Sequence, residues 1–76
     1  MADRIVTNPG ILQGKPIIEG TRISVAFVLK LLASGLTVDA ILDEYPHLTR
    51  DGVMAAIDYA RQVVEGEDII PTVEAA

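Results

Sequence analysis

The chain has 76 residues, half of them apolar, with no cysteine, one histidine and a formal net charge of −5. This length allows one small domain, and the absence of cysteine excludes disulfides and thiolate chemistry. Because no apolar run reaches the roughly 20 residues that span a bilayer and no export signal is present, we expect a cytoplasmic protein that binds no membrane and no cofactor.

Two β-prone segments, residues 4–7 and 16–18, open the chain. An Asn-Pro-Gly sequence at 8–10 separates them with strong turn chemistry, and a second turn follows at Glu19-Gly20. Together these signals predict a short β clasp over residues 4–23. We expect this clasp to lie over the apolar helix that comes next.

The segment 14–24, GKPIIEGTRIS, contains two glycines and two of the six cations of the chain. It is not a nucleotide-binding phosphate loop, because Pro9 stands where the first glycine of that pattern belongs and Pro16 replaces its hydroxyl residue. Either Lys15 and Arg22 contact a phosphate, or the segment is structural and Arg22 ties helix-end carbonyls or a carboxylate together. We favour the structural alternative, with these clasp and anchor residues: Gly14, Lys15, Pro16, Gly20, Thr21 and Arg22.

A strongly apolar helix is predicted at about 24–34, with Ser24 as its N-cap and Gly35 just after its end. Its sequence VAFVLKLLA has Lys30 as the only charge, and a helix that is apolar on nearly every side is not a surface helix. Either the N-terminal strands cover it, or part of it faces another subunit. The second alternative predicts a homodimer, with these residues at the interface: Phe27, Val28 and Leu31.

Two further helices are predicted at 38–45 and 49–65, capped by Thr37 and Thr49. Two helices joined by a short turn have the layout of a helix-turn-helix. If DNA binds, the start of the last helix enters the major groove, with Arg50 and Arg61 nearest the bases.

Charge weighs against DNA binding by the isolated chain. The last helix carries three carboxylates but only two arginines. The negative net charge of the whole chain also repels phosphates. A complex with a basic protein would bind operator DNA more readily. The alternative is a three-helix packing unit that enters no groove.

Several separated blocks of this sequence, taken together, resemble the domain-of-unknown-function family 433, whose members are classed as predicted antitoxins. The blocks are Asn8-Pro9-Gly10, Gly14-Lys15-Pro16, Gly20-Thr21-Arg22-Ile23, residues 32–36, residues 41–49 and residues 55–60. The resemblance covers about residues 4–61. It implies a mainly α fold in which a short N-terminal β clasp precedes a three-helix, homeodomain-like helix-turn-helix domain. It also implies a toxin–antitoxin role beside a PIN-like ribonuclease.

The segment EDIIPTVEAA at 67–76 is an acidic tail that we separate from the domain at 1–66. An acidic segment with apolar anchors can mimic phosphates and lie across the basic surround of a ribonuclease active site. The alternative is a frayed chain end. The predicted toxin-binding residues are Glu65, Glu67, Asp68, Ile69 and Ile70.

No nucleophile is paired with a base, and His47 stands alone in a turn where it caps or packs, so we expect no enzyme. The leading hypothesis is a small dimeric antitoxin that sequesters a cognate PIN-like ribonuclease through acidic and apolar surface. The alternatives are a stand-alone helix-turn-helix regulator that binds DNA and a structural oligomerisation module.

Overall fold

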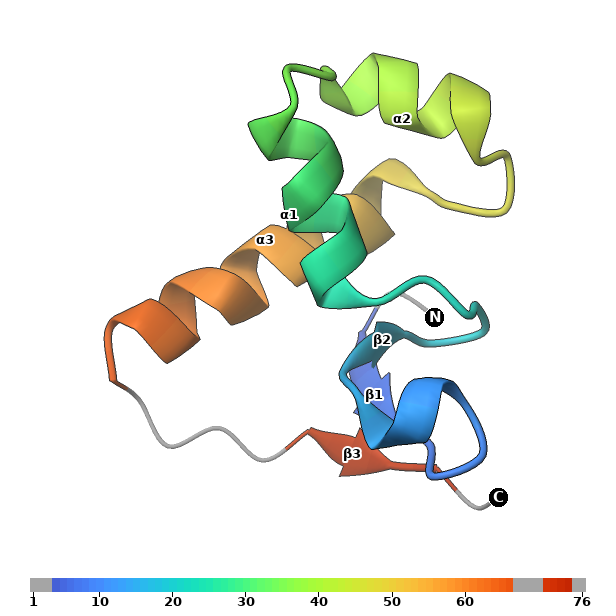
Figure 1. Cartoon of the computed structure of the whole chain (residues 1–76), viewed down its shortest axis with the longest axis vertical. Coiled ribbons are helices and arrows are strands. Elements are labelled where there is room, and N and C mark those ends of the chain that lie inside the picture. The colour runs from blue at the N-terminus through green and yellow to red at the C-terminus, as the bar shows by residue number, and fades with distance from the viewer. Residues whose placement is uncertain (1–3, 67–70, 75–76) are drawn as a thin grey trace.

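Three helices and a small sheet make up the part of the chain that the computed structural model describes, residues 4–66 and 71–74. In chain order the elements are β1 (Ile5–Thr7), a single 3₁₀ turn η1 (Leu12–Gly14), β2 (Ile17–Ile18), α1 (Val25–Ala33), α2 (Val38–Glu44), α3 (Arg50–Val64) and β3 (Thr72–Val73). Figure 1 shows the sheet at one end of the molecule and α2 at the other, with α1 and α3 crossing between them. The expected combination of three helices with a small N-terminal sheet is therefore confirmed.

The three helices begin directly after the three predicted caps. The side-chain oxygens of Ser24, Thr37 and Thr49 each accept a hydrogen bond from the backbone N–H three residues further on, at 2.9, 3.1 and 2.9 Å. Gly35 and Gly66 follow the ends of α1 and α3 with φ of 105° and 79°, a left-handed backbone that suits glycine. The predicted helix bounds are confirmed to within one residue at each end.

In the sheet, β1 lies between β2 and β3. β2 runs antiparallel to β1, with Val6 opposite Ile17, and β3 runs parallel to it, with Val6 opposite Thr72. The N–H of Glu74 donates to the carbonyl of Thr7 at 2.6 Å. Because β3 comes from the segment predicted as a separate acidic tail, residues 71–74 of that tail form part of the sheet.

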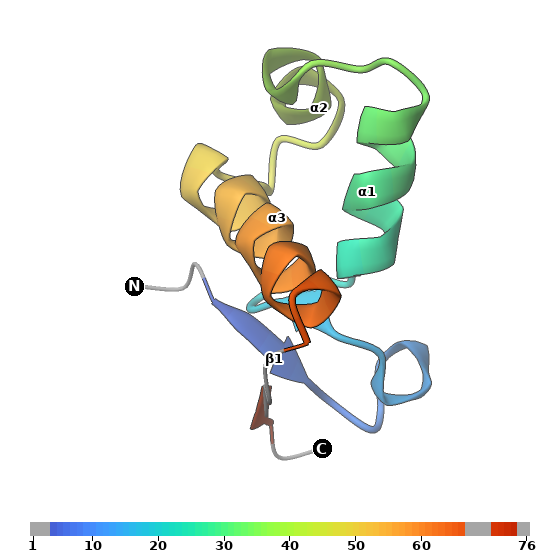
Figure 2. The same cartoon turned by 90° about the vertical axis from the view of Figure 1, so that its left-hand side faces the viewer.

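One core joins the clasp to all three helices. The largest fully buried side chains are Val6, Ile17, Val28, Ile41 and Val53. β1 and β2 pack chiefly against α3, and α1 packs against the same helix. Figure 2 shows the strands below the lower ends of both helices. The clasp therefore covers α3 rather than lying over α1 as expected, and the outer side of α1 stays open.

Candidate partner-binding surface

An apolar groove of about 350 Å³ runs between α1 and α3. Its lining comes from both helices: Val25, Ala26, Leu29, Ala60, Val63 and Val64. Lys15 lies at its edge, and Tyr59 also lines it. We call this surface the α1–α3 groove.

The groove is apolar because α1 displays apolar side chains on two faces. Val25 and Val28 point into the core, whereas Ala26 and Leu29 are exposed. The last turns of α3 extend beyond α1 (Figure 1), and there Val64 is 87% exposed. Apolar side chains outnumber the buried positions that this small fold provides, so some remain in water.

The residues predicted for a dimer interface do not form this open face. Val28 is fully buried in the core of its own chain, so a second copy cannot reach it. Phe27 is half-buried and packs edge-on against Tyr45, with ring centroids 5.6 Å apart. Leu31 is half-buried against the same core. Sequence reasoning missed Leu29, because a helix that is apolar on nearly every side gives no signal of which apolar side chains face out.

Both arginines predicted to approach DNA are engaged by carboxylates of this chain. Arg50 donates to Asp39 of α2. Arg61 donates to Asp58 at 2.9 Å and to Glu65 at 2.8 Å. Hydrogen bonds to Asp58 and then to Glu65 raise the pKa of Arg61 above its usual value. A phosphate that approaches either guanidinium therefore competes with a carboxylate already in place.

Four of the predicted clasp residues shape the chain before α1. Gly14 and Gly20 have left-handed φ of 81° and 80°. The carbonyl of Pro16 accepts from the N–H of Val25 at 3.0 Å. The hydroxyl of Thr21 donates to the carbonyl of Ile18 at 2.8 Å and accepts from the N–H of Ile23 at 3.0 Å.

The ionic anchor of the clasp is Arg4 rather than the expected Arg22. Two nitrogens of Arg4 donate to the two carboxylate oxygens of Glu19, both at 3.1 Å, in a bidentate pair. Arg22 and Lys15 are exposed, and neither pairs with a carboxylate in the described segments.

Of the residues predicted to bind a toxin, only Glu65 belongs to the described part of the chain, where it pairs with Arg61. Glu67, Asp68, Ile69 and Ile70 lie outside the described residues. Within residues 4–66 and 71–74, no three acidic or histidine side chains come close enough together to hold a metal ion. None of the helices in those ranges is long and apolar enough to cross a membrane.

His47 is exposed and lines a hollow of about 540 Å³ together with Arg22 and Glu74. The sequence placed it in a turn, and it follows Pro46 in the connection between α2 and α3. Glu74 also accepts a hydrogen bond from the amide of Asn8 at 3.3 Å. This hollow brings together an imidazole, a guanidinium and a carboxylate, but no nucleophilic side chain lines it apart from the hydroxyl of Thr21, which is used within the clasp.

The sequence profile of the family described as protein of unknown function (DUF433) matches residues 5–60. The chain belongs to this family. An uncharacterized protein of Sinorhizobium fredii (strain NBRC 101917 / NGR234), y4eO, is 34% identical over 56 residues, which are 74% of this chain and 25% of that protein. The chain thus spans about a quarter of the length of this relative. No solved structure matches the chain.

Proposed function

We propose that this chain is a protein-binding antitoxin that neutralises a PIN-like ribonuclease by holding an apolar segment of that nuclease in the α1–α3 groove. The observation that supports this function is the exposure of the apolar side chains in the groove. Leu29, Val63 and Val64 are 37, 52 and 87% exposed. Burial of apolar surface against a partner is favourable by about 25 cal/mol per Å², and large contiguous exposed apolar patches mark interaction sites.

Charge selects a basic partner. Nine of the eleven acidic residues but only two of the six cations follow Leu36, so the half of the chain that contains α2 and α3 is strongly anionic. A ribonuclease surrounds its active site with basic groups that hold RNA. Complementary potentials of this kind speed association and exclude partners of the wrong charge.

The same proposal includes a homeodomain-like role for α2 and α3, in which they bind operator DNA. The two helices are joined by residues 45–49, one residue more than the three- or four-residue turn of a helix-turn-helix. Since Arg50 and Arg61 are held by carboxylates, the nuclease in the complex supplies the positive charge that operator DNA requires. The isolated chain is then a weak DNA binder.

The test is co-expression with the product of the neighbouring reading frame, which this proposal predicts to be a PIN-like nuclease, using a tag on that partner. We expect the wild-type chain to co-purify with it and to restore growth. Leu29→Asp and Val63→Asp place a charge in the groove and should abolish both effects, because a buried unpaired carboxylate opposes binding. Met54→Asp is the matched control, since Met54 is 49% exposed and does not line the groove.

Circular dichroism shows first that each variant is folded. A folded Leu29→Asp variant that still co-purifies and still restores growth would exclude the groove as the nuclease-binding surface. Absence of any complex with the wild-type chain would exclude the antitoxin function itself. Equal loss in Met54→Asp would show that charge on any part of the surface is enough, and would also count against the groove.

A further inference from the structure

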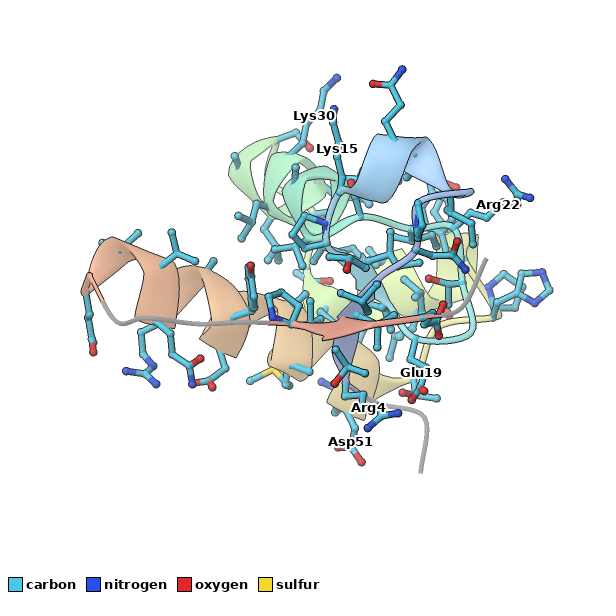
Figure 3. All side chains as sticks on the ribbon, turned by 90° about the horizontal axis from the view of Figure 1, so that it is seen from below. Arg4, Lys15, Glu19, Arg22, Lys30 and Asp51 are labelled. Atoms are coloured by element: carbon cyan, nitrogen blue, oxygen red, sulfur yellow. The ribbon has the colours of Figure 1, made fainter. Side chains whose placement is uncertain are left out.

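Three cations that pair with no carboxylate in the described segments gather on one face of the molecule. Figure 3 shows Lys15, Arg22 and Lys30 on the side that carries α1 and the turn before β2, with Arg4, Glu19 and Asp51 on the opposite side. Between residues 8 and 36 the sequence has a single carboxylate, Glu19, which is held by Arg4. These three cations make that face locally cationic in a chain with a net charge of −5, and a carboxylate from another element, that of Glu74, borders a hollow with Arg22.

Two of these cations line the same hollow. Lys15 and Arg22 border a pocket of about 350 Å³ whose apolar walls are Leu12, Ile23 and Phe27. Ser24 completes it, with its hydroxyl oxygen engaged as the cap of α1. We call this hollow the cationic pocket. It meets the α1–α3 groove at Lys15 and Ser24, which line both, and Lys30 lines neither.

The backbone holds the walls of the cationic pocket in place. Leu12 and Gln13 have left-handed φ of 49° and 59°, which non-glycine residues adopt only where the surroundings impose it. Three backbone hydrogen bonds fix this turn: Ile11 N–H to Asn8 O at 2.9 Å, Gly14 N–H to Ile11 O at 3.0 Å and Lys15 N–H to Leu12 O at 3.2 Å. On the other wall, the edge-on contact with Tyr45 orients the ring of Phe27. The pocket is thus formed before any ligand arrives.

We propose that the cationic pocket binds an acidic peptide segment of a partner protein, with one carboxylate at Arg22, a second at Lys15 and an apolar side chain between them against Leu12, Ile23 and Phe27. Arg22 has its whole guanidinium available for a bidentate contact with a carboxylate, because it spends no donor on the described part of its own chain. The apolar walls add affinity that only a side chain with carbon atoms can use.

A nucleic acid matches these features less well. A phosphodiester backbone uses the two cations but gains little from Leu12 and Phe27, and nucleic-acid affinity depends on neutralising several phosphates at once. The anionic half of the chain also repels a long polyanion, whereas a short acidic segment contacts only the cationic face. This inference does not depend on the antitoxin function, and the two are tested by different ligands.

The test is an NMR titration of the ¹⁵N-labelled chain at physiological salt with a peptide of about eight alternating glutamate and leucine residues. We expect amide shifts concentrated on residues that line the cationic pocket, and none with the corresponding lysine–leucine peptide. Arg22→Glu should weaken binding by about tenfold or more, because it replaces the attractive charge with a repulsive one. Lys15→Glu should act in the same direction.

Lys30→Glu is the matched control, since it makes the same charge change on the same face outside the pocket. It should weaken binding by about twofold at most, because salt screens exposed charges that do not touch the ligand. Arg22 and Lys30 are both exposed, so neither substitution should unfold the chain. Retention of the wild-type pattern of amide resonances verifies that each variant is folded.

Three outcomes would overturn the proposal. The first is the absence of shifts up to millimolar acidic peptide. The second is equal weakening by Arg22→Glu and Lys30→Glu, which would mean diffuse attraction rather than a pocket. The third is a short DNA duplex that shifts the same amides at lower concentration than the peptide does, which would assign the face to nucleic acid.

Discussion

The clasp and α1, up to residue 36, differ from the region of α2 and α3 in how they use charge. In the first region Lys15, Arg22 and Lys30 have no acidic partner in the described segments. In the second region Arg50 and Arg61 are each bound by a carboxylate a short distance away. Arg50 and Arg61, which the sequence predicted to contact DNA, are therefore paired with carboxylates, whereas Lys15, Arg22 and Lys30 are not.

The two regions nevertheless share one core. Ile18 of β2 belongs to the same buried cluster as Ile41 of α2, and Val28 and Val53 join it from α1 and α3, while the neighbouring Ile17 is also fully buried. The difference between the regions is therefore a property of the surface. A mutation in the core should affect both regions alike, whereas a mutation on the surface should separate them.

The largest effect is expected from truncating one fully buried isoleucine in each region. Ile17→Ala and Ile41→Ala should each lower the free energy of unfolding by about 2–5 kcal/mol, through lost burial and the cavity left behind. Urea denaturation followed by circular dichroism measures this change. If the alanine variants do not fold, the comparison between the two regions is made with Ile17→Val and Ile41→Val. Each of these should lower the free energy of unfolding by about 0.5–1.5 kcal/mol.

The control for this pair is Leu12→Ala, because Leu12 is 44% exposed and a surface truncation should change stability by less than about 0.5 kcal/mol. A loss at Ile17 no greater than the loss at Leu12 would mean that the clasp is not part of the core. The molecule would then be a three-helix unit with a detachable N-terminal arm.

An intermediate effect is expected at the helix caps. Ser24→Ala and Thr37→Ala each remove a hydroxyl that accepts a backbone N–H, and should cost about 0.5–2 kcal/mol. Ser24 is only 8% exposed and Thr37 is exposed, so we expect the larger loss at Ser24, where water cannot replace the missing acceptor. The same urea titration decides this order, and a larger loss at Thr37 would contradict it.

The smallest effect is expected at the Arg50–Asp39 pair. Both side chains are more than half exposed, so Arg50→Gln should change the free energy of unfolding by less than about 0.5 kcal/mol. A gel shift of the isolated chain on its own promoter at moderate salt should be equally insensitive to this substitution. Loss of a shift that the wild-type chain produces would place Arg50 in a DNA interface and restore the role expected from the sequence.

Local signals predicted the helices well because they act within a few residues. A hydroxyl residue before each apolar run marks the start of a helix, because its side chain accepts a hydrogen bond from a backbone N–H of the first turn. A glycine after α1 and α3 marks the end, because it adopts the left-handed backbone that stops the helix. Tertiary contacts decided the points that were missed. β3 is two residues long and exposed, and only its pairing with β1, more than 60 residues earlier in the chain, makes it a strand.

For the candidate surfaces, too, the sequence predicted one part and the tertiary structure decided the rest. The sequence indicated more apolar side chains than a chain of this size can bury, and Leu29, Val63 and Val64 are exposed as that excess requires. It did not indicate which side chains these are, because α1 is apolar on nearly all sides. Similarly, it marked Lys15 and Arg22 as unusual but did not show that they border one pocket.

By itself the sequence determined the family, the three capped helices, the turn-rich clasp and the excess of apolar and acidic residues, since each depends on residue type or on neighbours along the chain. The tertiary structure alone decided which face of α1 stays open, that Arg4 rather than Arg22 anchors the clasp, and which cations remain available. These depend on distances between residues far apart in the chain, and charge and exposure at a surface are set by the packing that brings such residues together.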